Sequence, residues 1–246
     1  MTRVDSLDRV PQRVPGEVWP VRTQYVAFLA LAAVLACLTA IQAVASRADY
    51  DRYFGGLPPT IVVLAAGAIG LGTLAMLRSI AGFRIVAGCA TGRGIAVSAG
   101  YATLLAVAII VADVLIGYPE NTNVPVPQAF LFYPTVGFVA EVVFHLVPLT
   151  LLVLALRPLR HRIGIDRVVS IAVVITAVAE PTYQILFEGE RLTWASGYTW
   201  VHVGAIAFLQ LRVFRRYDFA SLFAFRMIYY AYWHIIWGVI RLTVLF

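Results

Sequence analysis

The sequence predicts an all-α protein, a polytopic membrane helical bundle with about seven transmembrane helices. Its 246 residues are 61% hydrophobic and only 13% charged, with a mean hydropathy of +0.84, values typical of membrane proteins that cross the bilayer several times. Apolar runs of about 20 residues, the length that spans a bilayer, recur along the chain. Arginines gather in alternate loops between these runs, which is the pattern of the positive-inside rule.

The elements follow in order from the N-terminus. Residues 1–24 are polar and contain three prolines, which favours a cytoplasmic tail outside an integral membrane domain of residues 25–246. Within that domain the apolar runs lie near 25–46, 59–79, 95–117, 129–156, 168–187, 199–213 and 220–245. The sixth run is short for a full span. Pro148 and Pro181 interrupt the fourth and fifth runs, where each removes a helix hydrogen bond and bends the helix.

The arginines predict the orientation in the membrane. Fourteen of the 19 lie in the N-terminal segment and in the second, fourth and sixth loops, against three in the alternate loops. Cytoplasmic loops carry such an excess, so we expect a multi-pass protein of a prokaryotic cell membrane with its N-terminus in the cytoplasm and its C-terminus outside. The net charge of +6 then reflects topology and anionic lipid. The expected partner is the lipid bilayer, and no nucleic acid is expected.

Several ionisable side chains fall inside predicted spans, where they are costly and mark functional sites. Glu141 and His145 lie four residues apart on one helix face,. Depths counted from the outer helix ends at about 1.5 Å per residue are about 17 Å for Glu141 and His234, about 10 Å for Glu180 and about 5 Å for His202. We therefore predict one cavity that opens outward and contains Glu141, Glu180, His202 and His234, with His145 a turn deeper.

The last span carries a polar stripe. Arg226, Tyr230, His234 and Arg241 fall within an arc of about 100° on one helix face. The two arginines lie near the helix ends, where we expect their guanidinium groups to reach the membrane surface. Asp113, close to the outer end of the third span, is expected at the interface as well. His234 has no interface nearby, which leaves a structural hydrogen bond or a catalytic role.

Three stretches resemble the CPBP family (CAAX proteases and bacteriocin-processing enzymes, also called Abi). The run Ala140-Glu141-Val142-Val143-Phe144-His145 has the spacing of the first family motif, a glutamate pair followed by arginine, with alanine and histidine in the outer positions. The run His234-Ile235-Ile236-Trp237-Gly238 is similar to the third motif, a histidine four residues before asparagine. Thr176 and Glu180 stand where the second motif has phenylalanine and histidine. The resemblance covers about 129–246.

This resemblance implies an intramembrane helical fold in which a glutamate activates water to cleave a peptide bond without an essential metal. Glu141 would be the general base, and His234 would orient the water or stabilise the oxyanion. His145 would take the place of the family arginine, and Glu180 completes the candidate catalytic set. The substrate would be a membrane-embedded peptide, with no metal or other cofactor.

Two other hypotheses stay open at the level of sequence. Histidine and glutamate side chains are ligands that zinc and non-haem iron accept, so the same residues are compatible with a metal-dependent membrane enzyme. The third hypothesis is a non-catalytic scaffold, immunity or small-solute transport protein that keeps a CPBP-like fold with altered motifs.

Overall fold

The computed structural model describes residues 19–43, 47–187 and 193–246, which form helices joined by turns and short loops and contain no strand. The predicted all-α fold class is confirmed. Residues 1–18 of the expected tail lie outside the described residues, so the boundary of the membrane domain stays a prediction.

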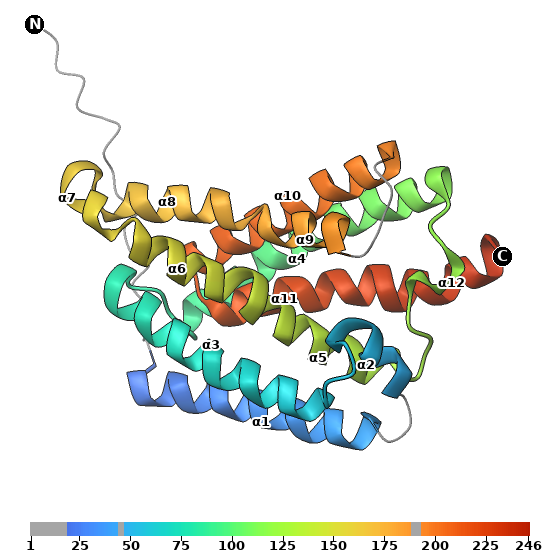
Figure 1. Ribbon diagram of the computed structural model, residues 1–246, viewed down its shortest axis with the longest axis horizontal. Coiled ribbons are helices and arrows are strands. Elements are labelled where there is room, and N and C mark those ends of the chain that lie inside the picture. The colour runs from blue at the N-terminus through green and yellow to red at the C-terminus, as the bar shows by residue number, and fades with distance from the viewer. Residues whose placement is uncertain (1–18, 44–46, 188–192) are drawn as a thin grey trace, which may run out of the picture.

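The long helices run back and forth between two ends of the molecule (Figure 1). The first half consists of α1 (Val21–Ala43), α2 (Arg47–Phe54), α3 (Pro59–Ala81), α4 (Cys89–Ile116) and the short turn η1 (Glu120–Thr122). The middle consists of α5 (Ala129–Ala140), η2 (Glu141–Leu146), α6 (Val147–Ala155), η3 (Arg157–Leu159), α7 (Arg160–Ile163), α8 (Ile165–Thr176) and α9 (Ala179–Phe187). The last part consists of α10 (Trp194–Arg216), α11 (Phe219–Tyr230), η4 (Ala231–Ile236) and α12 (Trp237–Val244).

Five helical segments of the described chain are long and apolar enough to cross a membrane: Val21–Ala43, Pro59–Ala81, Cys89–Ile116, Ala129–Ala155 and Ile165–Leu186. They correspond to the first five predicted spans, as expected for an integral membrane protein. The break between α8 and α9 falls just before Pro181, where the missing N–H was expected to bend the helix.

The last two predicted spans are helical but less apolar. The sixth was expected to be short, yet α10 has 23 residues, because its first turn begins earlier than the apolar run. There the Thr193 hydroxyl accepts from the N–H of Ser196 at 3.2 Å, a capping box that starts a helix in a polar sequence. The seventh run forms α11, η4 and α12 without a break. Charged and aromatic polar side chains lower the hydropathy of this segment.

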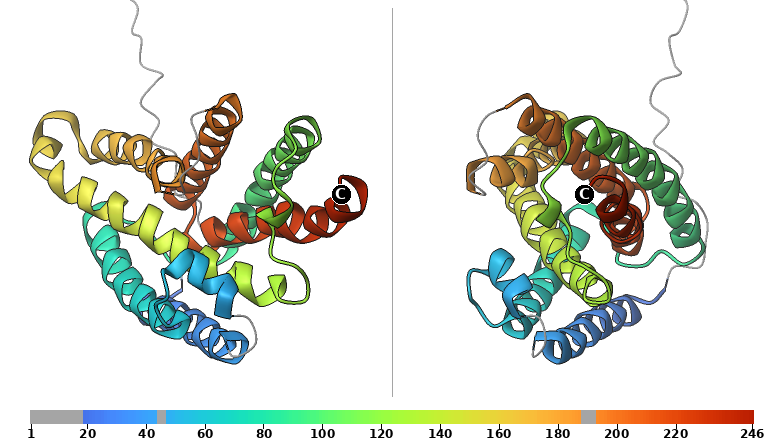
Figure 2. Two further views of the ribbon diagram at one scale, coloured as in Figure 1. Left: turned by 45° about the vertical axis from the view of Figure 1, so that its right-hand side comes forward. Right: turned by 90° about the vertical axis from the view of Figure 1, so that its right-hand side faces the viewer.

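The helix α11 lies near the middle of the bundle. Its residues Phe219, Leu222 and Phe225 are at most 1% exposed, and the end-on view shows the red helix surrounded by the others (Figure 2, right). It packs closely along α4, where the Ser98 hydroxyl donates to the carbonyl of Ser221 at 2.8 Å. Polar side chains on α11 therefore face protein.

The expected surface position of Asp113 and Arg241 is wrong, since both are 0% exposed. Arg241 Nε and Nη2 donate to the two carboxylate oxygens of Asp113 at 2.8 and 3.0 Å. Arg241 also donates to the carbonyls of Tyr118 and Pro119 at 2.7 and 2.9 Å, and Trp237 Nε1 donates to Asp113 at 2.7 Å. Because each charge is compensated by the other, the pair can be buried. It connects α12 to α4 and to the loop that follows α4.

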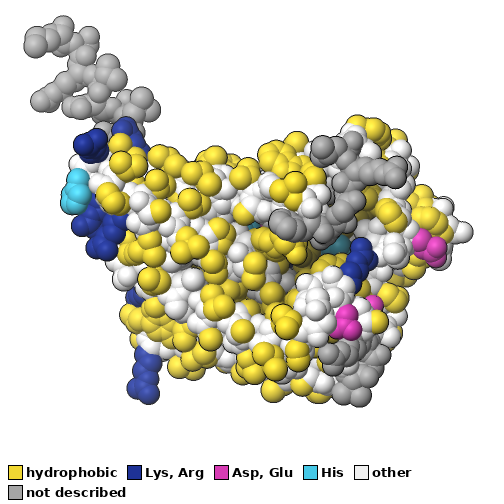
Figure 3. Space-filling view, viewed as in Figure 1, with side chains coloured by type: hydrophobic (Ala, Val, Ile, Leu, Met, Phe, Trp, Pro, Cys, Tyr) yellow, Lys and Arg dark blue, Asp and Glu magenta, His cyan; other side chains and the backbone are white. Residues whose placement is uncertain are grey.

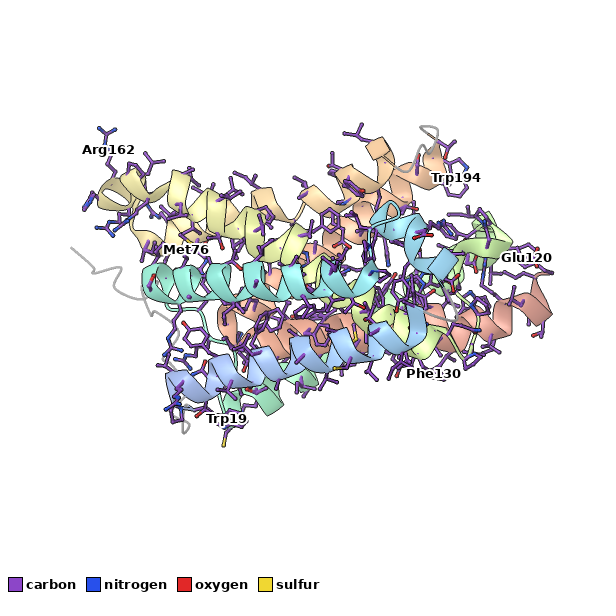
Figure 4. The ribbon with its side chains drawn as sticks, turned by 60° about the horizontal axis from the view of Figure 1, so that its bottom comes forward. Trp19, Met76, Glu120, Phe130, Arg162 and Trp194 are labelled. Atoms are coloured by element: carbon purple, nitrogen blue, oxygen red, sulfur yellow. The ribbon has the colours of Figure 1, made fainter. Side chains whose placement is uncertain are left out.

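The two ends of the bundle differ in charge. Trp19, Met76 and Arg162 lie at one end, and Glu120, Phe130 and Trp194 lie at the other (Figure 4). Apolar side chains cover much of the face between them, arginines gather at the first end, and acidic side chains lie toward the second (Figure 3). The loops that the sequence assigns to one side of the membrane are thus found at one end.

Candidate functional site

Glu141 and His145 lie in η2, a π-helical turn in the middle of the fourth span. Here the N–H of Val147 donates to the carbonyl of Val142, five residues back. Pro148 follows directly and has no N–H for the carbonyl of Phe144, so the regular ladder cannot continue. Such widened turns are rare in proteins overall, and many of those that occur lie at functional sites. The predicted effect of Pro148 thus coincides with the site itself.

Glu141 is completely buried, and both of its carboxylate oxygens are hydrogen-bonded. His145 Nδ1 donates to Oε2. Gln210 Nε2, from α10, donates to Oε1 at 2.6 Å, and Arg226 Nε, from α11, donates to the same atom. Three helical segments therefore converge on one carboxylate in the centre of the bundle.

Arg226 joins Glu141 to the second glutamate. Its Nη1 and Nη2 each donate to one oxygen of Glu180 at 2.8 Å, a bidentate pair of the kind that fixes geometry strongly. Nη1 also donates to the hydroxyl of Tyr230 at 3.0 Å. Arg226 is 3% exposed and Glu180 is 5% exposed. The expectation that Arg226 reaches the membrane surface is therefore wrong: the two buried glutamates satisfy its charge.

His145 closes the cluster on the other side. Its Nε2 lies 3.7 Å from Glu180 Oε2, too far for a hydrogen bond. Within the described residues, His145 Nε2, Gln210 Oε1 and Thr176 Oγ1 are buried polar atoms without a hydrogen-bond partner. Buried polar atoms are normally satisfied by protein or by water. The central cluster, which comprises Glu141, His145, Glu180, Gln210 and Arg226, thus offers polar atoms for a bound water.

His234 does not join the central cluster directly. It lies in the second π-helical turn, η4, and its Nδ1 donates to Asn123 Oδ1 at 2.8 Å. Its ring stacks on Tyr133 at 4.3 Å and meets the ring of Tyr230 at 4.8 Å. Since Tyr230 bonds to Arg226, His234 is one side chain removed from the cluster.

His202 is separate from the predicted cavity. Its Nε2 is hydrogen-bonded to the hydroxyl of Tyr229 at 3.1 Å, and its ring stacks on Tyr198 at 5.6 Å. Helix α10 turns this residue toward tyrosines of α10 and α11. Of the four residues predicted to share one cavity, only Glu141 and Glu180 lie together, with His145 beside them. His202 and His234 have other partners.

The sequence interpretation missed Gln210 and misplaced Arg226 as cluster members. Arg226 already belonged to the polar stripe of the last span, and two buried carboxylates require a cation nearby. These two facts could have predicted from the sequence that Arg226 pairs with the glutamates. Gln210 lies in the run Leu209-Gln210-Leu211, where a lone amide among leucines marks a buried hydrogen bond. Its partner could not be inferred without the helix packing.

A metal ion does not fit the central cluster. Among the described residues, no three histidine, cysteine, aspartate or glutamate side chains are arranged to hold one ion. The guanidinium of Arg226 lies between the two carboxylates, in the place that a cation bridging them would take. The donor set is thus already matched by a side-chain cation.

Comparison of the chain with protein-family models, curated proteins and solved structures finds no match. The resemblance to the CPBP family therefore rests on the sequence motifs alone.

Proposed function

We propose that this integral membrane protein carries out proton transfer inside the bilayer, with His145 as the group that accepts and releases the proton. One observation carries the proposal. Glu141 holds His145 through Nδ1, while Nε2 is buried, lacks a hydrogen bond within the described residues and lies 3.7 Å from Glu180 Oε2. A carboxylate that fixes the Nδ1–H of a histidine presents the lone pair of Nε2 to a reacting group.

The charges of the central cluster support one proton site. Two glutamates and one arginine give a formal charge of −1 when His145 is neutral. One proton on Nε2 brings the formal charge to zero. Because unbalanced charge inside a bilayer is costly, a single proton is the natural cargo of this cluster.

The activity that we propose for the centre is hydrolysis of a membrane-embedded peptide, as the CPBP resemblance implies. Three of the four candidate catalytic side chains, Glu141, His145 and Glu180, come together. The roles differ from those expected from sequence. Both oxygens of Glu141 are occupied, so Glu141 orients His145, and His145 serves as the general base.

Proton-coupled transport is a second candidate, and Arg226 favours it. Its guanidinium binds both glutamates, and protonation of either carboxylate would weaken one of these bonds. Helix α11 carries Arg226 and α9 carries Glu180, so proton uptake would loosen the contact between two helices. Chains of buried acids and histidines serve this purpose in pumps and transporters.

We also propose an orientation. The end of the bundle with Trp19 and Arg162 faces the cytoplasm, and the end with Glu120 faces outward (Figure 4). The partition of arginines between the two sets of loops supports this assignment.

The proposal is tested on purified protein in liposomes with two assays, cleavage of transmembrane peptides read by mass spectrometry and proton flux read by an internal pH dye. We expect activity in one of them, and its identity selects between the two candidates. His145→Gln and Glu141→Gln should each lower that activity by about 100-fold or more. The matched control is His161→Gln, because His161 is an exposed residue of the short helix α7.

The control variant should keep full activity, and all variants should reach the membrane in similar amounts. Full activity in His145→Gln, or an inactive wild-type protein in both assays, would contradict proton transfer at His145.

A further inference from the structure

Every fourth residue of the last helix lies along one ridge that leads from the central cluster to the outer end. These residues are Arg226, Tyr230, His234, Gly238 and Leu242. Residues four apart on a helix are neighbours on its surface, and the row winds gradually around the helix over the sixteen-residue interval, which corresponds to about 24 Å. The side chains along the ridge are polar at its inner end. Toward the outer end they are replaced by a glycine, Gly238, and then by an apolar residue, Leu242.

The outer end of this ridge meets a cavity of about 610 Å³. Leu242 lines it from α12, and Asp49, Arg52 and Tyr53 line it from α2. Glu120 and Asn123 line it from the loop that follows α4. The cavity lies at the end of the molecule that carries Glu120 (Figure 4). A volume of this size with a partly polar lining accommodates many water molecules,.

Asn123 connects the cavity to His234. It lines the cavity, and its Oδ1 accepts from His234 Nδ1 at 2.8 Å. Its Nδ2 is buried without a hydrogen-bond partner in the described part of the chain, which is the situation expected where a water completes the network. With the proton on Nδ1, the other ring nitrogen of His234 is an acceptor.

Gly238 makes room for this contact. A Cβ at this position would lie 3.0 Å from Nδ2 of Asn123 and 3.3 Å from its Cβ. The asparagine therefore rests against bare helix backbone, one turn above the histidine that it holds. Any larger side chain at position 238 would press on Asn123.

Two further contacts complete the route inward. The rings of His234 and Tyr230 meet at 4.8 Å, and the hydroxyl of Tyr230 accepts from Arg226 at 3.0 Å. Arg226 binds both glutamates of the central cluster. Hydrogen bonds thus join Asn123 to His234 and Tyr230 to Arg226, and an edge-to-face ring contact joins His234 to Tyr230, so contacting side chains lead from the cavity to Glu141.

We propose that the cavity is a vestibule through which water and protons reach the central cluster from the Glu120 end, and that Asn123 and His234 form its inner gate. The purpose of the vestibule rests on the proton transfer proposed for His145. Its accessibility does not, so the two can be tested separately.

The test measures thiol labelling in membrane vesicles of the full-length chain. Cys37 and Cys89 are free and exposed, so the background carries Cys37→Ser and Cys89→Ser. A charged, membrane-impermeant thiol reagent is added to either side. Asn121→Cys, at an exposed position of the same loop, reports which side the Glu120 end faces. His234→Cys is then compared with Trp233→Cys, which lies at nearly the same depth but is 5% exposed within an apolar cluster.

We expect His234→Cys to react only from the side that labels Asn121→Cys, and at least about tenfold faster than Trp233→Cys, because accessibility controls thiol reactivity. Adding Gly238→Val should slow labelling at position 234. The control Gly100→Val should not, since nothing lies within 4 Å of a Cβ at Gly100. The same labelling should persist with His145→Gln present.

Absence of labelling at position 234, labelling from the opposite side, or equal rates in the Gly238→Val and Gly100→Val variants would overturn the vestibule. Loss of activity in His145→Gln with unchanged labelling would support both proposals. Labelling without any activity in the wild-type protein would contradict proton transfer alone.

Discussion

Arg226 is the side chain on which the buried carboxylates depend. It supplies hydrogen bonds to both glutamates, and all three residues are at most 5% exposed. Removing one partner from a buried ion network leaves uncompensated charge, which costs far more than the intact pair contributes. The arginine therefore contributes to stability chiefly by preventing that loss.

Arg226→Met should destabilise the protein by about 3–5 kcal/mol, seen as a lower midpoint of thermal unfolding in detergent. The matched control is Arg215→Met. Arg215 pairs with Asp166 at 3.0 Å near the surface, where an ion pair contributes about 0–1 kcal/mol. Equal midpoints for the two variants would show that the carboxylates of the cluster do not need the guanidinium.

The contact between α4 and α11 depends on a glycine. A Cβ at Gly94 would lie 2.8 Å from Cβ of Ser221 and 2.9 Å from Cβ of Tyr217, closer than real side chains approach. The two helices therefore pack with almost no space between backbones, and α11 is held where Arg226 can reach Glu141. Small residues permit this approach in membrane bundles.

Gly94→Ala should therefore separate α4 from α11 and cost about 1–3 kcal/mol, as overpacking does. Gly92→Ala on the same helix provides the control, because nothing lies within 4 Å of its Cβ. Alanine is a better helix former than glycine, so that variant should be neutral or up to about 1 kcal/mol more stable. Thermal unfolding of both variants in one detergent gives the comparison, and a destabilisation in Gly92→Ala of the same size would refute it.

Both π-helical turns bring functional candidates to the centre of long helices. The first contains Glu141 and His145, and the second contains His234. Pro148 explains the position of the first from sequence. The second contains no proline, and no signal in the sequence marks its position.

The whole molecule has one end that is rich in arginine and an opposite end with acidic side chains (Figure 3). With Cys37 and Cys89 replaced by serine, Arg162→Cys and Asn121→Cys should label from opposite sides of the membrane, because Arg162 and Glu120, the residue before Asn121, lie at opposite ends of the bundle (Figure 4). The positive-inside rule places Arg162 in the cytoplasm. Labelling of both positions from one side would refute the transmembrane arrangement, and labelling of Asn121→Cys from the cytoplasm would refute the proposed orientation.

The sequence by itself determined the fold class and the five helical segments that are long and apolar enough to cross a membrane, because bilayer thickness fixes the length of an apolar helix. It also identified Glu141 and His145 as neighbours, since helical periodicity places residues four apart on one face. Local signals of this kind need no knowledge of the partner helices.

Only the tertiary structure decided which polar groups meet. The depths counted along the helices correctly predicted that Glu180 lies near Glu141. They contain no information on the direction in which each side chain points, and His202 points toward Tyr229 and His234 toward Asn123. The two arginines of the last helix were expected at the surface and are buried instead. Carboxylates on other helices form ion pairs with them: Glu141 and Glu180 with Arg226, and Asp113 with Arg241. The cost of burying a charge depends on its partner, and that partner lies far away in the sequence.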